Sequence, residues 1–150
     1  MKYTKRNIKN ASGFTMVELM AMLIIIGLLA TLVATKVASK IDDAKVTTTK
    51  ANLKTLHMAV TQFKMHTGRY PTEEDGLFAL IEAPADVDVE NYEEGGYLET
   101  TDIPKDGWKN EYYYELYPES GKPFVIISWG ADGEEGGEGR DKDLYSTDAE

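Results

Sequence analysis

The sequence predicts an α+β protein in which one long N-terminal α-helix packs on a small antiparallel β-sheet domain that ends in a candidate metal-binding loop. Three observations lead to this prediction. An uncharged apolar run continues directly into an amphipathic helical pattern. Two short segments rich in aromatic and β-branched residues flank a turn that contains Pro and Gly. The last of the three is a loop near the C-terminus that is crowded with acids and glycines.

Length and composition already exclude several classes of protein. A chain of 150 residues predicts one domain with an appendage. The absence of cysteine excludes a disulfide framework, zinc-finger spacing and a thiol nucleophile. The net charge of −10 argues against a partner that is a nucleic acid, because phosphate backbones favour Lys and Arg.

The charges are segregated along the chain. Residues 1–13 carry four bases and no acid, residues 14–35 carry Glu18 as their single charge, residues 36–72 carry seven bases against two acids, and residues 73–150 carry 23 acids against five bases. This order predicts a single-pass membrane anchor with the N-terminus in the cytoplasm. We divide the chain into a leader (1–13), a membrane-spanning segment (14–35), an amphipathic stalk helix (36–68) and a globular domain (69–150).

The segment from Phe14 to Ala34 has 21 residues, close to the roughly 20 needed to cross a membrane as a helix. A secretory signal peptide fits poorly, because no A-x-A-like site is followed by a polar mature start. Glu18 distinguishes the segment from a plain anchor. A carboxylate inside an apolar span costs on the order of 2.5–3.5 kcal/mol and usually has a partner there.

Gly13-Phe14-Thr15-Met16-Val17-Glu18, preceded by a basic leader and followed by the apolar run, resembles the type IV prepilin signal. The resemblance implies that a membrane prepilin peptidase cuts between Gly13 and Phe14 and that the new amino terminus at Phe14 is N-methylated. The cut would create a positive amine at Phe14. Glu18 of a neighbouring subunit could then pair with this amine, which relieves both charges and sets the axial register of an assembly.

Apolar residues recur every three or four positions after the span, which predicts a helix that continues to about Thr67. Gly68 and Pro71 are typical of a helix end. His57 and His66 are nine residues apart and form no metal pair, so we expect both at the surface. Where pilin-like proteins often have a proline, the run has Thr35, which keeps a helix hydrogen bond that proline would remove.

The globular domain contains a predicted short helix after Thr72, an irregular acidic stretch from Ala85 to Glu94, and two strands. The strands are Tyr112–Leu116 and Pro123–Trp129, joined by a turn around residues 118–122. A sheet formed from them would cover the apolar face of the stalk helix. The tail beyond Leu144, residues 146–150, is acidic and is expected to be disordered.

Residues 130–144 pack six acids and five glycines into 15 positions. Carboxylate oxygens suit Ca²⁺, and glycines allow a loop to fold around an ion. The spacing is not that of an EF-hand. From composition alone, a Ca²⁺ site and a solvated acidic loop are equally favoured.

Three further blocks resemble the major pseudopilins of type II secretion: residues 44–80, residues 96–114 and residues 128–144. The resemblance implies that the loop 128–144 binds one Ca²⁺. Its matching ligands are Asp132, Asp141, Asp143 and the backbone carbonyl of Trp129.

No Ser/His/Asp set, phosphate loop or paired catalytic carboxylate stands out in the sequence, so we do not expect an enzyme. The resemblance implies a structural subunit that polymerises into a periplasmic filament, which drives export of folded proteins across the outer membrane. Its expected partners are further copies of itself, minor pseudopilins, the inner-membrane assembly platform and the prepilin peptidase. Two alternatives are a type IV pilin and a competence pseudopilin that captures DNA. The first usually has a cysteine pair near its C-terminus, and the second conflicts with the acidic domain.

Overall fold

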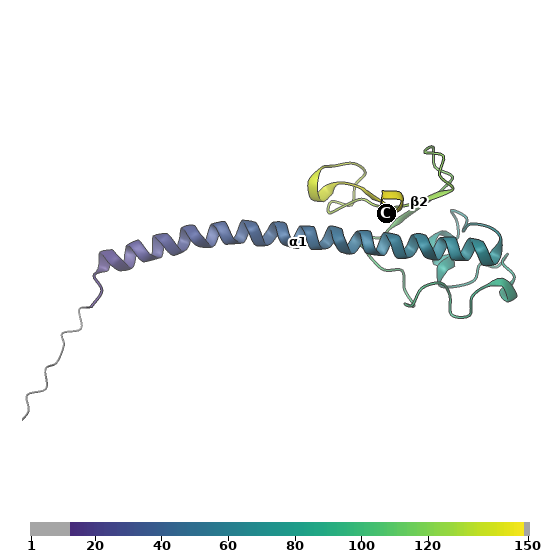
Figure 1. The fold of residues 1–150 in the computed structure, drawn as a ribbon, viewed down its shortest axis with the longest axis horizontal. Helices are drawn as coiled ribbons and strands as arrows, with labels where there is room; N and C mark the ends of the chain where they lie inside the picture. Colours follow the sequence, from purple (N-terminus) through teal and green to yellow (C-terminus); the bar gives the residue numbers. More distant parts are fainter. Residues whose placement is uncertain (1–12, 149–150) are drawn as a thin grey trace, which may run out of the picture. The chain divides into compact units, whose positions relative to one another are not determined.

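The computed structural model describes residues 13–148, so the expected leader lies outside the described residues except for Gly13. One helix, α1 (Met16–Thr67), is followed by short 3₁₀ turns and by three strands, β1 (Tyr113–Leu116), β2 (Phe124–Ser128) and β3 (Leu144–Tyr145). The chain forms two compact units that meet between Ser39 and Lys40, and each is described by itself. Figure 1 shows the ribbon.

The predicted long helix is confirmed, and it ends where the glycine signal placed its end. Gly68 adopts a positive φ of 80°, and its N–H donates to the carbonyl of Lys64 at 3.0 Å. A left-handed residue of this kind closes the last turn of a helix and is most easily supplied by glycine. Thr35 does not interrupt α1, and its hydroxyl donates to the carbonyl of Leu32 at 3.0 Å.

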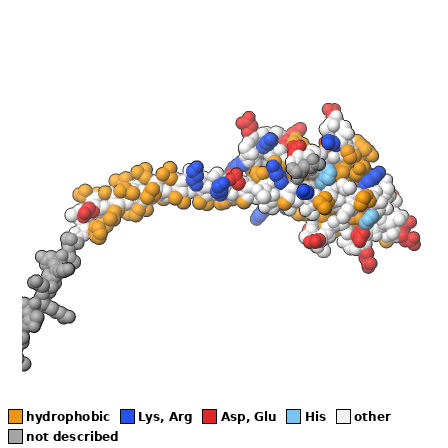
Figure 2. Space-filling model, viewed as in Figure 1, with side chains coloured by type: hydrophobic (Ala, Val, Ile, Leu, Met, Phe, Trp, Pro, Cys, Tyr) orange, Lys and Arg blue, Asp and Glu red, His pale blue; other side chains and the backbone are white. Residues whose placement is uncertain are grey.

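The N-terminal unit consists of the apolar part of α1. Its large apolar side chains are solvent-exposed, and Figure 2 shows them covering this part of the helix. Within the described residues, α1 holds one window that is long and apolar enough to cross a membrane, and none of that window is buried. A helix that is apolar all round requires a lipid or protein environment.

The second unit is built around a buried stripe on α1. Leu53, Leu56, Val60 and Phe63 are fully buried, at spacings of three and four residues that place them on one helical face. This is the face that the amphipathic pattern predicted to need a cover. The core against it also contains Leu80 and Ile126.

The sheet supplies much of this cover. Its strand order is β1-β2-β3, and both pairs are antiparallel, with Tyr114 opposite Ile126 and Ser128 opposite Leu144. The predicted hairpin is confirmed: the N–H of Tyr117 donates to the carbonyl of Pro123 at 3.0 Å across the turn. β2 is the central strand and is buried along its whole length.

The segment between α1 and β1 contains two 3₁₀ turns, η1 (Gly76–Leu80) and η2 (Val89–Asn91). The helix expected after Thr72 is therefore only the short 3₁₀ turn η1. The Thr72 hydroxyl accepts from the N–H of Asp75 at 3.1 Å, and the Asp75 carboxylate accepts from the N–H of Thr72 at 3.2 Å. In Figure 1 the sheet and this segment lie on opposite sides of the C-terminal part of α1.

Two expectations about the surface were wrong. The tail is ordered through Asp148: β3 pairs with β2, and η4 (Ser146–Asp148) follows it, whereas residues 149 and 150 lie outside the described residues. Ser146 is buried, and its hydroxyl accepts from the N–H of Ile126 at 3.0 Å.

His57 is half-buried, because its ring packs 4.5 Å from the Phe124 ring and its Nδ1 lies 3.2 Å from the Ser146 hydroxyl. His66 is exposed, as expected.

Candidate functional site

The first candidate site is the start of α1, which the sequence singled out for processing and assembly. Phe14 is 70% exposed, and Thr15 and Glu18 form a reciprocal cap at the helix start. Glu18 Oε2 accepts from the Thr15 N–H at 2.9 Å and from its hydroxyl at 3.1 Å, while the Glu18 N–H donates to the Thr15 hydroxyl at 3.2 Å. This pattern is a capping box, which satisfies backbone donors that a helix start leaves unpaired.

The capping box ties Glu18 to its own chain, whereas sequence reasoning considered only a partner from another subunit. Both bonds to the carboxylate use Oε2. The motif itself therefore leaves Oε1 for a further donor. The cap was not predicted from the sequence, although the spacing T-x-x-E from Thr15 to Glu18 is a recognisable signal for it.

The second candidate site is the loop between β2 and β3. Its backbone turns repeatedly through left-handed conformations at glycine, and two of these glycines are required by close approach. A side chain at Gly130 would begin 2.6 Å from the Asp141 carbonyl carbon, and one at Gly137 would begin 2.6 Å from the Asp141 carbonyl oxygen. The glycines therefore allow the two arms of the loop to touch.

Asp143 is the buried carboxylate of this loop, with 8% of its surface exposed. Oδ2 accepts from the Gly136 N–H at 3.0 Å and from the Tyr145 hydroxyl at 3.3 Å. Burial, and then the negative charge of Asp143, raise the pKa of Tyr145, so its phenol stays protonated and donates. Oδ1 is buried and has no hydrogen-bond partner within the described residues. A buried charged oxygen without a partner is costly, and a cation would remove that cost.

The other three predicted ligands lie in the same loop but make local contacts. Asp132 is exposed, and its Oδ1 accepts from the Glu134 N–H at 3.2 Å. Asp141 is half-buried, with Oδ1 3.6 Å from the Arg140 guanidinium. The carbonyl of Trp129 accepts from the Gly133 N–H at 3.2 Å. The part of the chain that is described holds no cluster of three His, Asp or Glu side chains arranged around one point.

A buried polar network that the sequence did not predict supports the base of this loop. Asp106 Oδ1 accepts from the N–H groups of Trp108 at 2.9 Å and Asn110 at 2.8 Å. The Asn110 amide in turn donates to the carbonyl of Gly130 at 2.9 Å, at the start of the loop. On the helix side, the Gly107 N–H donates to the hydroxyl of the buried Thr49 at 2.9 Å. The network therefore joins α1 to the loop.

These features together define a pilin-like subunit: a long helix with an apolar N-terminal part headed by Phe14 and Glu18, followed by a small antiparallel sheet domain built on the same helix. The pattern of the family described as "Type II secretion system (T2SS), protein G" matches residues 36–147. The chain belongs to this family.

Relatives agree along nearly the whole chain. The type II secretion system core protein G of Pseudomonas aeruginosa is 39% identical over 141 residues, which cover 93% of this chain and 97% of the relative. The core protein G of Vibrio cholerae is 34% identical over 139 residues and 93% of each chain. The crystal structure of the major pseudopilin of enterohaemorrhagic Escherichia coli matches with a TM-score of 0.57 and 28% identity, over 69% of this chain and 87% of that chain.

Proposed function

We propose that this chain is a structural subunit that polymerises into the pseudopilus of a type II secretion system and so drives export of folded proteins across the outer membrane. The observation that carries the proposal is that one chain of the protein G family combines an exposed, strongly apolar helical segment with a folded domain. Such a helix needs a second environment besides water: the membrane before assembly and the packed helices of a filament afterwards.

Processing would prepare the subunit for this change of environment. Cleavage between Gly13 and Phe14 by a prepilin peptidase would remove the basic leader and its Lys and Arg side chains, and N-methylation would follow at Phe14. The described chain supports this proposal by placing Gly13 and Phe14 just outside the capped start of α1, where no regular helix hydrogen bonds obstruct them.

Glu18 would then pair with the Phe14 amine of a neighbouring subunit. Glu18 is the single charge among residues 14–35, so an apolar filament core would leave it without other ionic partners from this segment. In the capping box, Oε2 of Glu18 accepts hydrogen bonds from its own chain, and Oε1 would accept one from the Phe14 amine of the neighbour. The bond to Thr15 would also keep the carboxylate partly satisfied before assembly, since an unpaired charge in a membrane is costly.

The loop 128–144 would bind Ca²⁺ and hold the base of the sheet together. Asp143 fits a hard cation, because its buried Oδ1 has no donor. Asp132, Asp141 and the Trp129 carbonyl would complete an oxygen set after a change in the local contacts that they make now. Since the chain has no cysteine, a bound cation would replace a disulfide as the cross-link of this small domain.

Deletion of the gene in its own bacterium, followed by assays of secreted enzymes, twitching motility and DNA uptake, tests the function. Loss of secretion alone is expected, and loss of only motility or transformation would contradict the proposal. Complementation with Glu18→Ala should give a membrane-inserted, cleaved subunit that fails to form filaments. Asp43→Ala removes an exposed acid elsewhere on α1 and is the matched control, which should assemble normally.

A further inference from the structure

A groove lies between α1 and the far end of the sheet, away from the acidic loop 128–144. Its volume is about 470 Å³. Met58 on α1 and Pro123 before β2 are exposed and contribute apolar surface, and Lys54 and Lys122 line it as well. Among the described residues, 13–148, no Asp or Glu lines it. Met58 is 55% exposed, so the groove presents apolar surface next to the two lysines.

The opposite kind of surface occurs in the segment after η1. Residues 82–102 contain eight acids and no Lys or Arg. In their middle, η2 displays Val89 with 75% of its surface exposed, between Asp88 and Glu90. Val89 therefore keeps most of its apolar surface in contact with water within its own chain.

The turn that displays Val89 is held by hydrogen bonds and by ring packing. The Asp88 carboxylate caps it by accepting from the Glu90 N–H at 3.1 Å. The Tyr92 hydroxyl, directly after the turn, donates to the carbonyl of Ala79 at 3.0 Å, and its ring packs edge-on against Phe63 in the core. The contacts of Asp88 and Tyr92 therefore hold Val89 in an exposed position. A surface that is already ordered loses less conformational entropy when it binds a partner.

We propose that the Val89 turn of one copy of this chain docks into the Met58 groove of a second copy. Val89 would meet the apolar surface of the groove, and the acids beside it would meet Lys54 and Lys122. The apolar contact supplies affinity, and the opposite charges set register and exclude other alignments. The inference rests on the proposed function, because it names a contact between neighbouring subunits of the filament.

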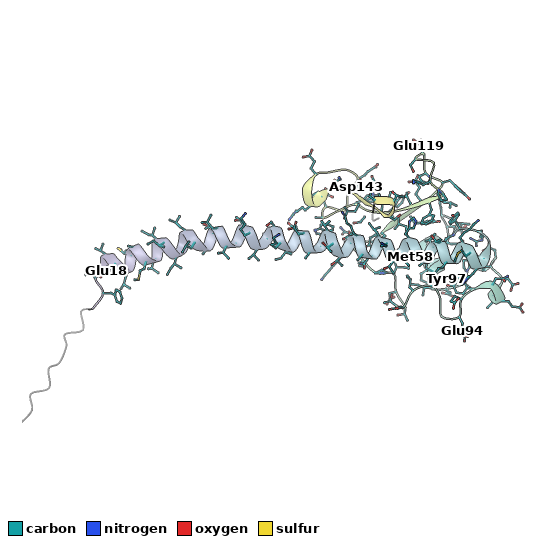
Figure 3. The ribbon with its side chains drawn as sticks, viewed as in Figure 1. Glu18, Met58, Glu94, Tyr97, Glu119 and Asp143 are labelled. Carbon is teal, nitrogen blue, oxygen red and sulfur yellow. The ribbon has the colours of Figure 1, made fainter. Side chains whose placement is uncertain are left out.

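The two surfaces cannot satisfy each other within one copy. In Figure 3 the acidic segment, marked by Glu94, lies on one side of α1, whereas the sheet side is marked by Glu119 and Asp143. Because the two surfaces differ and lie apart, a single contact leaves a free groove on one copy and a free Val89 turn on the other. A contact of this heterologous type continues from copy to copy and generates a filament unless rotation closes a ring.

Disulfide cross-linking in the producing bacterium tests the contact, and the chain is suited to it because it has no cysteine of its own. Two full-length versions with different tags are produced together, one with Val89→Cys and one with Met58→Cys. Oxidation should yield a dimer that carries both tags. Met65→Cys is the matched control: it is the same residue on the same helix, is 69% exposed and does not line the groove. Its yield with Val89→Cys should be severalfold lower.

Charge reversal provides a second measurement that does not depend on cysteine. Lys54→Glu should reduce the filament yield, and Glu90→Lys in the same chain should restore it. Equal cross-linking of the Met58→Cys and Met65→Cys versions, or no rescue by Glu90→Lys, would overturn the inference while wild-type filaments and secretion remain intact. If the wild-type chain forms no filaments and supports no secretion, the proposed function itself fails.

Discussion

The hydroxyl of Ser128 donates a 2.7 Å hydrogen bond to Oδ2 of Asp106, and both residues are buried. This bond links the end of the central strand β2 to the segment before β1. Oδ1 of the same carboxylate accepts two backbone N–H groups, so a single side chain organises the turn that follows it. Asp106 is thus a positioning residue at the base of the candidate cation loop.

We expect Asp106→Ala to lower the free energy of unfolding by about 3 kcal/mol or more, because it leaves the Ser128 hydroxyl and two backbone N–H groups without their acceptor. Denaturant unfolding of a soluble fragment that begins at Ile41 measures this; the second compact unit begins at Lys40. Asp102→Ala removes an exposed acid from the same segment and should change stability by less than about 0.5 kcal/mol. Similar losses in both variants would contradict the assigned role.

Calcium should raise the melting temperature of the same fragment, and a chelator should reverse the rise. A ligand at 100 times its Kd stabilises the folded state by about 2.7 kcal/mol. Asp143→Asn should abolish the response, whereas Asp148→Asn, which alters an exposed acid after β3, should retain it. A melting temperature that does not respond to calcium would show that the loop is only a solvated acidic segment.

Acid should destabilise the domain partly through Asp75. Burial, the largest single influence, acts to raise the pKa of Asp75, but hydrogen bonds from Thr72 and the charge of Arg69 together lower it. Because the folded pKa is lower than the unfolded one, this carboxylate stabilises the fold above the unfolded pKa. That contribution is lost as the pH falls through the folded pKa.

Asp75→Asn should therefore flatten the loss of stability on the acid side, in denaturant titrations repeated at a series of pH values. Glu74→Gln is the control, because Glu74 is an exposed neighbour in the sequence. Identical acid limbs for Asp75→Asn and the wild type would show that the link from Arg69 to Asp75, 3.2 Å long, has no part in acid sensitivity.

A substitution at Ser146 tests whether the ordered tail, η4, contributes to the stability of the fold. Ser146→Ala would leave the buried N–H of Ile126 without its acceptor, at a cost of about 1–3 kcal/mol in the free energy of unfolding. Ser120→Ala, in the exposed hairpin turn, should be nearly neutral. A neutral Ser146→Ala would indicate that the tail contributes nothing to the fold.

Sequence patterns predicted the helix and the two longer strands, because neighbouring residues in the chain are enough to favour these elements. The 3.6-residue period and Gly68 predicted α1 to within two residues at its start and at its observed end, Thr67. The aromatic and β-branched segments predicted β1 and β2 within one residue at each end. β3 was missed because two residues carry no periodic pattern, and this strand exists only through its pairing with β2. His57 was misplaced for the same reason, since its environment comes from Phe124 and Ser146.

The sequence by itself determined the class of this protein. The charge order, the Gly13-Phe14 junction, Glu18 and the apolar run are read along the chain, because a membrane-spanning segment and a prepilin-like signal are both defined by contiguous residues. Only the tertiary structure decided which acids are buried. Asp106 and Asp143 are buried, whereas Asp102 and Asp132 are exposed, although all four are aspartates and no local pattern in the sequence separates them. What separates them is burial, which makes a carboxylate costly unless distant partners or a cation satisfy it.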